Sequence, residues 1–316
     1  MKVHKVAEYY ARILEEVEKV IVGKRDVIEK LFMTILSNGH VLLEDYPGLA
    51  KTLMAKTLAT AIGCDFRRIQ FTPDLLPADI TGTYVYNQKT QEFELRKGPI
   101  FTNILLADEV NRAPPKTQSA LLEAMQERQV TIEGNTHKLE DPFVVFATQN
   151  PIEFEGVYPL PEAQIDRFLI KTSVGYPSKS EEIEILKRRI KRRSDYFEVN
   201  TVVTKRDVIE MQKSIEDVHV VDDILDYIVT VVEATRNHPN VEVGSSPRGS
   251  LALLKLSRSH AALHGRDYVI PDDVKFIAVE ALSHRILLRS EYWVKGIRPE
   301  DVIKEIINKV PVPKGP

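Results

Sequence analysis

Two adjacent acids follow a short apolar run near the middle of the chain. Residues 104–107 are apolar, and Asp108 and Glu109 come directly after them. A run this short, bounded by polar residues, predicts a buried parallel strand. Because an unpaired carboxylate is costly inside a strand, we expect both acids at its carboxyl end, where open α/β sheets bind ligands. One acid could hold a hydrated Mg²⁺ while the next orients a water, which is the Walker B chemistry of phosphate cleavage.

A candidate phosphate-binding loop lies upstream, in the sequence LLEDYPGLAKT of residues 42–52. An apolar strand precedes it, a Pro-Gly turn follows, and a helical pattern begins at Lys51. Helix N-termini present free N–H groups and a positive dipole end to phosphate. Lys51 would reach the β- and γ-phosphates, and the Thr52 hydroxyl would coordinate Mg²⁺. The strict Walker A pattern has glycine where this chain has Asp45 and Ala50, so this segment alone also fits an ordinary strand-to-helix turn.

The order of these motifs along the chain is more specific than any one of them. A third apolar strand, residues 143–148, is followed by Asn150 after one intervening residue. Parallel neighbours bring their carboxyl ends to one edge of a sheet, so Lys51, Asp108, Glu109 and Asn150 would surround one γ-phosphate. The alternative for Asn150 is a turn residue before the proline that follows it.

Apolar runs of strand length alternate with helical patterns through the first half of the chain. This alternation predicts an α/β fold with a mainly parallel, five-stranded sheet covered by helices on both faces. The strands are expected at 40–44, 66–70, 103–107, 143–148 and 168–173. The helices are expected at 5–21, 26–36, 51–62 and 115–126.

Two stretches interrupt this alternation. Residues 71–102 contain several prolines and glycines, so we expect an insertion there, with a hairpin formed by 83–86 and 93–96. A second hairpin is expected where 130–132 and 137–139 flank an Asn and a Gly, residues that tolerate positive φ.

The pattern after residue 177 is helical, with no clear strand. Helices are expected from Ser178 onward and at 204–216, 221–237, 248–264, 271–288 and 299–309. We therefore expect two domains, 1–177 and 178–316, with the boundary near residue 177.

The overall composition bounds the class of protein. A net charge of −3 gives no global basic field that would draw the chain to nucleic acid or an anionic membrane. The single cysteine, Cys64, cannot form an internal disulfide. The N-terminal segment lacks an apolar signal region, and no run of eighteen apolar residues occurs. We expect a soluble, cytoplasmic protein without membrane insertion.

Several long segments of this chain resemble the MoxR family of AAA+ ATPases. They are LLEDYPGLAKT (42–52), QFTPDLLPADITG (70–82), KGPIFTNILLADEVNRAPPKTQSALLEAMQE (97–127), ATQNPIEFEGVYPLPEAQIDRF (147–168) and SPRG (246–249). The resemblance covers nearly the whole chain. It implies a phosphate-loop αβα core, a helical lid domain, ATP with Mg²⁺ as ligands, and assembly into a ring that is typically hexameric.

The resemblance also implies roles for individual residues. Asp108 would be the Walker B acid on the Mg²⁺ side, and Glu109 would polarise the attacking water. Asn150 would be sensor 1, Arg167 the arginine finger and Arg248 sensor 2. Whether Arg248 acts on its own subunit's nucleotide or on a neighbour's stays open.

Both arginines have a plainer alternative. Arg167 could pair with Asp166 or Glu162, and Arg248 could be a surface residue at a helix N-terminus.

The remaining nucleotide contacts implied by the resemblance come from two segments. Val22 and Gly23 would lie near adenine. The loop residues expected to bind the nucleotide are Asp45, Tyr46, Pro47, Gly48, Leu49, Ala50, Lys51, Thr52 and Leu53. Residues 71–102 look like the helix-2 insert and residues 128–141 like the pre-sensor-1 hairpin, elements that face the pore in related rings.

The function implied is ATP hydrolysis that drives remodelling or maturation of a partner protein, such as one with a von Willebrand factor A domain. One rival is a DNA-acting motor related to helicase rings, although the mixed charges of hairpin 128–141 make a nucleic-acid partner less favoured. Another rival is a nucleotide switch that does not hydrolyse ATP. The acids at Asp108 and Glu109, with Asn150 and Arg167, argue against it.

Two further patterns favour structural interpretations. His260 and His264 have metal-ligand spacing on an expected helix, but the sequence offers no obvious third ligand, so a plain helix face is favoured. The basic run 187–193 follows three glutamates on one expected helix, which favours a solvated face over a nucleic-acid site.

Overall fold

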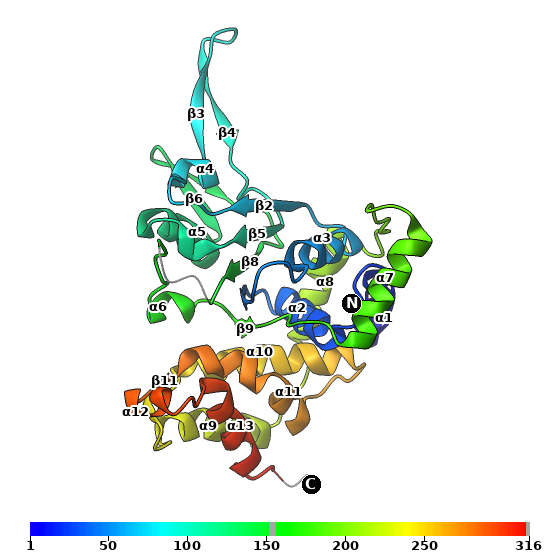
Figure 1. Cartoon of the computed structure of the whole chain (residues 1–316), viewed down its shortest axis with the longest axis vertical. Coiled ribbons are helices and arrows are strands. Elements are labelled where there is room, and N and C mark those ends of the chain that lie inside the picture. Colours follow the sequence, from blue (N-terminus) through cyan, green and yellow to red (C-terminus); the bar gives the residue numbers. More distant parts are fainter. Residues whose placement is uncertain (152–155, 314–316) are drawn as a thin grey trace.

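The computed structural model describes residues 1–151 and 156–313. Residues 152–155, inside the family-like segment 147–168, and residues 314–316, at the end of the second expected domain, lie outside this part. The centre is a five-stranded sheet in the order β2-β5-β8-β1-β9 (Figure 1). Its strands are β1 (Val41–Glu44), β2 (Phe66–Gln70), β5 (Ile104–Asp108), β8 (Val144–Gln149) and β9 (Ile170–Thr172). Neighbouring strands pair in parallel, which confirms the predicted sheet.

Alternate residues of these strands face two separate apolar clusters. Leu43 and Leu106 belong to the cluster that includes α1 (Val3–Glu18), α2 (Arg25–Leu36) and α3 (Lys51–Ala61). Leu42 and Leu105 face the other side, and α5 (Pro115–Glu127) covers that side. Because both faces are buried, the strands read as continuous apolar runs rather than as alternating ones.

Two hairpins extend from the core. The insertion forms α4 (Pro77–Thr81), β3 (Gly82–Asn87) and β4 (Glu92–Lys97), and its hairpin projects away from the sheet (Figure 1). The second hairpin is β6 (Gln129–Ile132) with β7 (Asn135–Lys138), so both predicted hairpins are confirmed.

A glycine is required where the first hairpin leaves the core. Gly82 has φ 95°, and a Cβ there would lie 2.3 Å from the carbonyl oxygen of Arg96. The two hairpins also touch each other, because Tyr84 Oη lies 3.2 Å from His137 Nε2 and Thr83 Oγ1 donates to Glu133 at 3.2 Å.

Helices dominate after residue 178, as predicted. They are α7 (Lys179–Arg192), α8 (Lys205–Ile215), α9 (Asp222–Arg236), α10 (Pro247–Leu263), α11 (Pro271–Leu282), α12 (Ser290–Val294) and α13 (Pro299–Lys309), with a short turn η2 (Ser283–Arg285) after α11. Two other short helical elements, η1 (Val110–Arg112) and α6 (Glu162–Ile165), lie before residue 178. Ser178 caps α7 by accepting from the Glu181 backbone N–H. Arg188 of α7 donates to the carbonyl oxygen of Glu18, which holds α7 beside α1 (Figure 1).

The expectation that no strand follows residue 178 is wrong in one place. β10 (Val241–Val243) pairs with β11 (Leu287–Leu288), and the helix expected at 271–288 ends at Leu282. Strands of two or three residues are too short to show an alternating pattern.

The expected domain boundary near residue 177 falls between β9 and α7. The apolar cluster that includes α1, α2 and α3 continues into α8, α10 and α11, so the two sides share one core. Within the described residues, no helix combines the length and apolar composition that crossing a membrane requires.

Candidate functional site

A cavity of about 500 Å³ lies at the carboxyl ends of β1, β2, β5 and β8, in the size range of small-molecule sites. We call it the Lys51 cavity. Predicted site residues that line it are Asp45, Pro47, Gly48, Leu49, Ala50, Lys51, Thr52, Leu53, Asp108, Glu109 and Asn150. The structure therefore brings the phosphate loop, both acids and Asn150 together, as the order of the motifs predicts.

The loop from β1 to α3 turns through two residues with positive φ. Gly48 has φ 83° and Ala50, the residue before α3, has φ 56°. The left-handed conformation costs alanine about 1 kcal/mol, which glycine would avoid. The Lys51 ammonium donates to the carbonyl oxygens of Asp45 and Tyr46, both at 3.1 Å, so it holds the loop in a tight curl at the helix N-terminus.

Asp45 explains why the first glycine of the strict pattern is replaced. Its buried carboxylate accepts from Ser173 Oγ at 2.7 Å, from the Val174 N–H at 2.6 Å and from the Gly175 N–H at 3.1 Å. These bonds tie the phosphate loop to the segment that follows β9. A short side chain with two acceptor oxygens suits these three donors.

Both acids are held by neighbouring polar side chains. Asp108 Oδ1 accepts from Thr148 Oγ1 at 2.6 Å, and its Oδ2 accepts from the Arg68 guanidinium at 2.6 Å. Glu109 Oε2 accepts from Gln70 Nε2 at 2.7 Å and from Arg112 at 3.1 Å. The two carboxylates therefore have fixed and different partners.

Four of these supporting residues were missed from the sequence, namely Arg68, Gln70, Arg112 and Thr148. Gln70 and Asp108 are register partners on adjacent parallel strands. A polar residue at the end of the expected strand 66–70 was therefore the one sign that Gln70 lies beside the acids. Arg68 was missed because it lies inside the expected strand 66–70, where nothing in the sequence shows that its side chain reaches Asp108.

The donor set of the Lys51 cavity fits a magnesium ion. The hydroxyl of Thr52 and the carboxylate of Asp108 line the same cavity, and hard oxygen ligands are what Mg²⁺ prefers. The Arg68 guanidinium shares Asp108 Oδ2, so it would have to yield part of that contact to a cation.

A more apolar cavity of about 330 Å³ adjoins the Lys51 cavity and shares Gly48, Leu49, Ala50 and Leu53 with it. Val22 lines it, as do Ile185 and Leu186 of α7. Gly23 does not line it. Gly23 has φ 66°, a left-handed conformation that favours glycine in the turn between α1 and α2.

Tyr46 also lies outside both cavities. It is exposed, and its ring stacks on Tyr176 with 6.0 Å between the centroids.

Arg167 and Arg248 line a different cavity of about 330 Å³. We call the surface around them, with Asp166 and Arg285, the arginine face. Arg167 donates to the Leu122 carbonyl oxygen at 3.2 Å. Within the described residues it makes no ion pair with Asp166 or Glu162, so the plainer alternative for Arg167 finds no support.

Asp166 instead holds two other arginines. Arg248 lies 3.2 Å from Asp166 Oδ2, and Arg285 lies 2.9 Å from Oδ1. Burial lowers the pKa of the Arg285 guanidinium to about 10, against the opposing charge of Asp166. Neither Arg285 nor Asp166 was predicted as part of a site, because the pair joins residues far apart in the sequence.

Comparison with known proteins agrees with this geometry. The family model described as "ATPase family associated with various cellular activities (AAA)" matches residues 40–170, and that of the AAA lid domain matches residues 233–306. A Mycobacterium tuberculosis protein named "Chaperone MoxR1" is 46% identical over 96% of this chain and 82% of its own length. The chain belongs to the MoxR family of AAA+ ATPases.

Two other similar proteins span almost the whole chain. The "Uncharacterized protein YeaC" of Bacillus subtilis is 52% identical over 96% of this chain and 94% of its own. A crystal structure of a Cytophaga hutchinsonii protein named "putative ATPase" is 44% identical, has a TM-score of 0.91, and covers 98% of this chain and 97% of its own.

The two family matches divide the expected MoxR site residues. The AAA match includes Lys51, Asp108, Asn150 and Arg167, whereas the lid match includes Arg248. Val22 and the helix α7 beside it lie outside both matches, so the apolar cavity is completed by parts of the chain that these two models do not describe.

Proposed function

We propose that this MoxR-family protein binds ATP with Mg²⁺ and hydrolyses it. The observation that carries the proposal is the Lys51 cavity, where a helix N-terminus, a lysine, two carboxylates and Asn150 line one space. A chain that only bound nucleotide would not need a second acid beside the Mg²⁺ ligand.

Each residue of the Lys51 cavity has its own role in the proposed hydrolysis. The N-terminus of α3 and the Lys51 ammonium bind the β- and γ-phosphates, and Thr52 with Asp108 holds the metal. A magnesium ion held by Thr52 and Asp108 would supply positive charge against the negative charge that develops on the phosphate. Glu109 accepts the proton of the attacking water, and Asn150 orients that water. The adjoining apolar cavity, with Val22, receives the adenine ring.

The partners of Glu109 define how it is positioned. Gln70 and Arg112 both bind Oε2, so the other carboxylate oxygen is the one that can turn to a water. We infer that these two residues set the direction of the general base.

The charge that completes the site comes from a neighbouring subunit in this proposal. Of the described residues, none lines both the Lys51 cavity and the cavity of the arginine face. Arg167 and Arg248 would therefore reach the γ-phosphate of an adjacent chain, with Arg248 acting in trans like Arg167. Such an arrangement requires head-to-tail contacts between identical chains, and we propose that they close into a hexameric ring.

ATP hydrolysis would drive remodelling or maturation of a partner protein. Support comes from the name of the similar Mycobacterium tuberculosis protein, a chaperone, and from the two hairpins that touch through Tyr84 and His137. A von Willebrand factor A domain protein is the partner class implied by the family resemblance, and the cytoplasm is the expected location. Hairpin β6–β7 carries both Glu133 and Lys138, a balance that gives no preference for a DNA partner.

The substitution Glu109→Gln tests the proposal. It removes the base and keeps the shape, so ATP binding should persist while hydrolysis falls by about 10²–10⁴-fold. Phosphate release at saturating ATP and binding of a fluorescent nucleotide report the two steps. Glu182→Gln, an exposed carboxylate on α7, is the matched control and should keep wild-type turnover.

The same assay separates the rival functions. Turnover in Glu109→Gln equal to wild type would contradict hydrolysis at this site and favour a switch. Stimulation of the wild-type rate by DNA, but not by protein clients, would favour a DNA-acting motor.

A further inference from the structure

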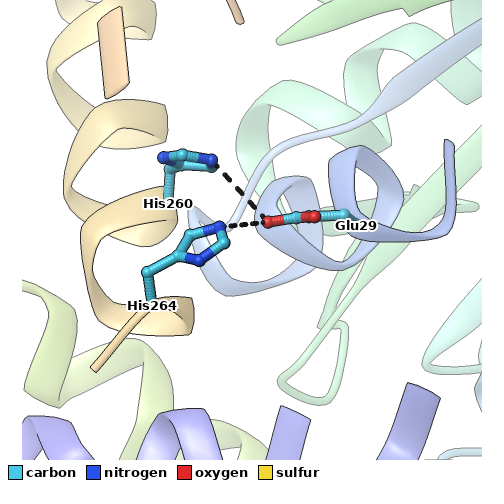
Figure 2. Close-up of side chains that lie close together, drawn as sticks. All are labelled: Glu29, His260 and His264. Carbon is cyan, nitrogen blue, oxygen red and sulfur yellow. Dashed lines mark hydrogen bonds and ion pairs between the residues drawn. The ribbon is translucent and has the colours of Figure 1, made fainter. Parts of the chain in front are cut away.

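A second cluster of ligand-type side chains lies where α2 packs on α10. Glu29 comes from α2, His260 from the last turn of α10, and His264 is the residue that follows α10. Figure 2 shows both imidazole rings and the carboxylate converging on one point. The sequence predicted a plain helix face here because it offered no third ligand. The fold supplies that ligand from a position 235 residues before His264.

The distances suit a single small cation. Glu29 Oε1 lies 2.8 Å from His264 Nε2 and 3.7 Å from His260 Nε2. One ligand atom from each of the three residues lies within 4.8 Å of the others. Ligand atoms around a tetrahedral Zn²⁺ with bonds near 2.0–2.1 Å are about 3.3 Å apart, so small side-chain rotations would bring the three atoms into place.

The hydrogen bonds of His260 leave one nitrogen facing an anion. His260 Nδ1 lies 2.5 Å from Oδ1 of Asp273, an ionised carboxylate that can only accept, so Nδ1 carries the proton. Nε2 then points toward the Glu29 carboxylate, 3.7 Å from Oε1. With its proton on Nδ1, His260 offers Nε2 as a ligand atom for a cation placed between the two groups.

Asp273 is itself firmly held. It is fully buried, and the Arg266 guanidinium binds both of its oxygens, at 2.8 and 2.5 Å. Phe276 stacks on the His260 ring with 4.4 Å between centroids. A carboxylate behind a histidine is the usual support of a metal-binding imidazole, since it fixes both tautomer and orientation.

Access to the cluster is from one side. The side chains of Glu29 and His260 are 10% and 12% exposed, whereas that of His264 is 48% exposed. A cation could enter past His264, and water could fill a remaining coordination position there.

We propose that Glu29, His260 and His264 form a Zn²⁺ site that fastens α10 to α2. Two imidazoles and one carboxylate are a donor set that zinc accepts, and Mg²⁺ does not favour nitrogen ligands. The site is separate from the Lys51 cavity. Arg248 lies in the first turn of α10, and the metal would hold the opposite end of the same helix. The site would therefore help to fix the position of α10, and with it that of Arg248.

Zinc titration of the full-length, tag-free chain tests the site. The protein is first treated with a chelator and then titrated calorimetrically with ZnCl₂ in excess Mg²⁺, which occupies oxygen-only sites. Wild type should bind one Zn²⁺ per chain with micromolar or tighter affinity, and its melting temperature should rise as zinc is added.

Matched variants identify the ligands. His264→Ala and Glu29→Gln should each weaken zinc binding by at least about 10-fold, as loss of one of three ligands requires. His264 is half-exposed at the end of its helix, so its removal should leave the fold intact in the absence of zinc. His219→Ala, an exposed histidine outside the cluster, should bind zinc like wild type.

Two results would overturn the proposal. One is the same zinc affinity in His264→Ala as in wild type. The other is no stoichiometric binding by wild type at micromolar zinc, in which case the hydrogen bond between His264 and Glu29 is a structural contact only. Neither result bears on ATP hydrolysis.

Discussion

The Lys51 cavity and the arginine face are built in different ways. The Lys51 cavity is formed by the ends of four parallel strands, and its acids are held by residues of the same sheet edge, such as Thr148 and Gln70. The arginine face is formed by a turn and a helix start, and Arg248 is held there by Asp166. The Lys51 cavity holds the predicted phosphate loop and acids, whereas the arginine face holds both arginines that the family resemblance predicts for the site.

Under the proposed function, one chain carries two halves of a site that is completed between subunits. Within the described residues, the charges of the arginine face meet no phosphate loop of their own chain. The substitutions below disturb one region or the other, from the largest expected effect to the smallest.

Loss of Arg167 should have the largest effect. Arg167→Ala should keep nucleotide binding and lower kcat by about 10³-fold or more, since an arginine finger acting across an interface is worth 10³–10⁵. Turnover and nucleotide affinity are measured in parallel. Arg12→Ala, an exposed arginine on α1, is the control. A kcat within a factor of three of wild type would remove the arginine face from the mechanism.

Loss of Asp45 should destabilise the other region. Asp45→Ala removes three charge-assisted hydrogen bonds and leaves the Val174 N–H buried, so the free energy of unfolding should fall by about 3 kcal/mol. ATP affinity should fall as well, because the phosphate loop loses its anchor. Urea unfolding and nucleotide titration measure the two effects. Unchanged stability would show that Asp45 is only a tolerated replacement for glycine.

The pH dependence of stability should report His40, which lines the cavity of the arginine face. Its Nδ1 accepts from the Val145 N–H and its Nε2 lies 2.9 Å from the Met125 carbonyl oxygen, so the buried ring is neutral. Burial, then the charge of Arg128, lower its pKa to about 3. The unfolded chain therefore takes up the proton first. His40 should contribute its full stability above about pH 6.5 and lose it as the pH falls, by about 2 kcal/mol between pH 7 and pH 5.

Urea unfolding of wild type and His40→Gln at both pH values measures this slope. His40→Gln should lose the part of the change in unfolding free energy that His40 causes. It should keep the part caused by His284, because burial also lowers the pKa of that histidine. His219→Gln should keep the whole slope. An equal slope in His40→Gln and wild type would contradict the assignment.

The smallest effect is expected at Ala50. Because its φ is 56°, Ala50→Gly should relieve strain and stabilise the protein by about 0.5–1 kcal/mol. Ala11→Gly, on the exposed side of α1, should instead cost about 1 kcal/mol. Thermal unfolding measures both. A loss of stability in Ala50→Gly would mean that the loop gains from the alanine methyl group.

Features that depend on local patterns could be predicted from the sequence. Lys51 begins α3 and Asp108 ends β5 as expected, because apolar periodicity and turn residues mark where elements start and stop. Both hairpins were marked in the same way.

Features that depend on polar pairing across the fold could not be predicted. Asp45 meets Val174, 129 residues away, and Glu29 meets His264, 235 residues away. Such pairs leave no periodic signal, since neither residue of a pair indicates its partner in the sequence. Arg285 was missed for this reason, although its buried pair with Asp166 organises the arginine face.

Mixing two inactive variants tests most directly whether the two regions meet across subunits. Lys51→Ala lacks the phosphate-binding lysine, and Arg167→Ala lacks the finger, so each should be inactive alone. In a mixed ring, an Arg167→Ala subunit still has an intact nucleotide pocket, and a neighbouring Lys51→Ala subunit still has an intact Arg167. An interface that combines these two is complete. Differently tagged chains that co-purify confirm that mixed rings form. An equal mixture should then recover about a quarter of wild-type hydrolysis, because about one interface in four is complete in random assembly. Co-purifying mixed rings with no recovered hydrolysis would contradict a site shared between chains.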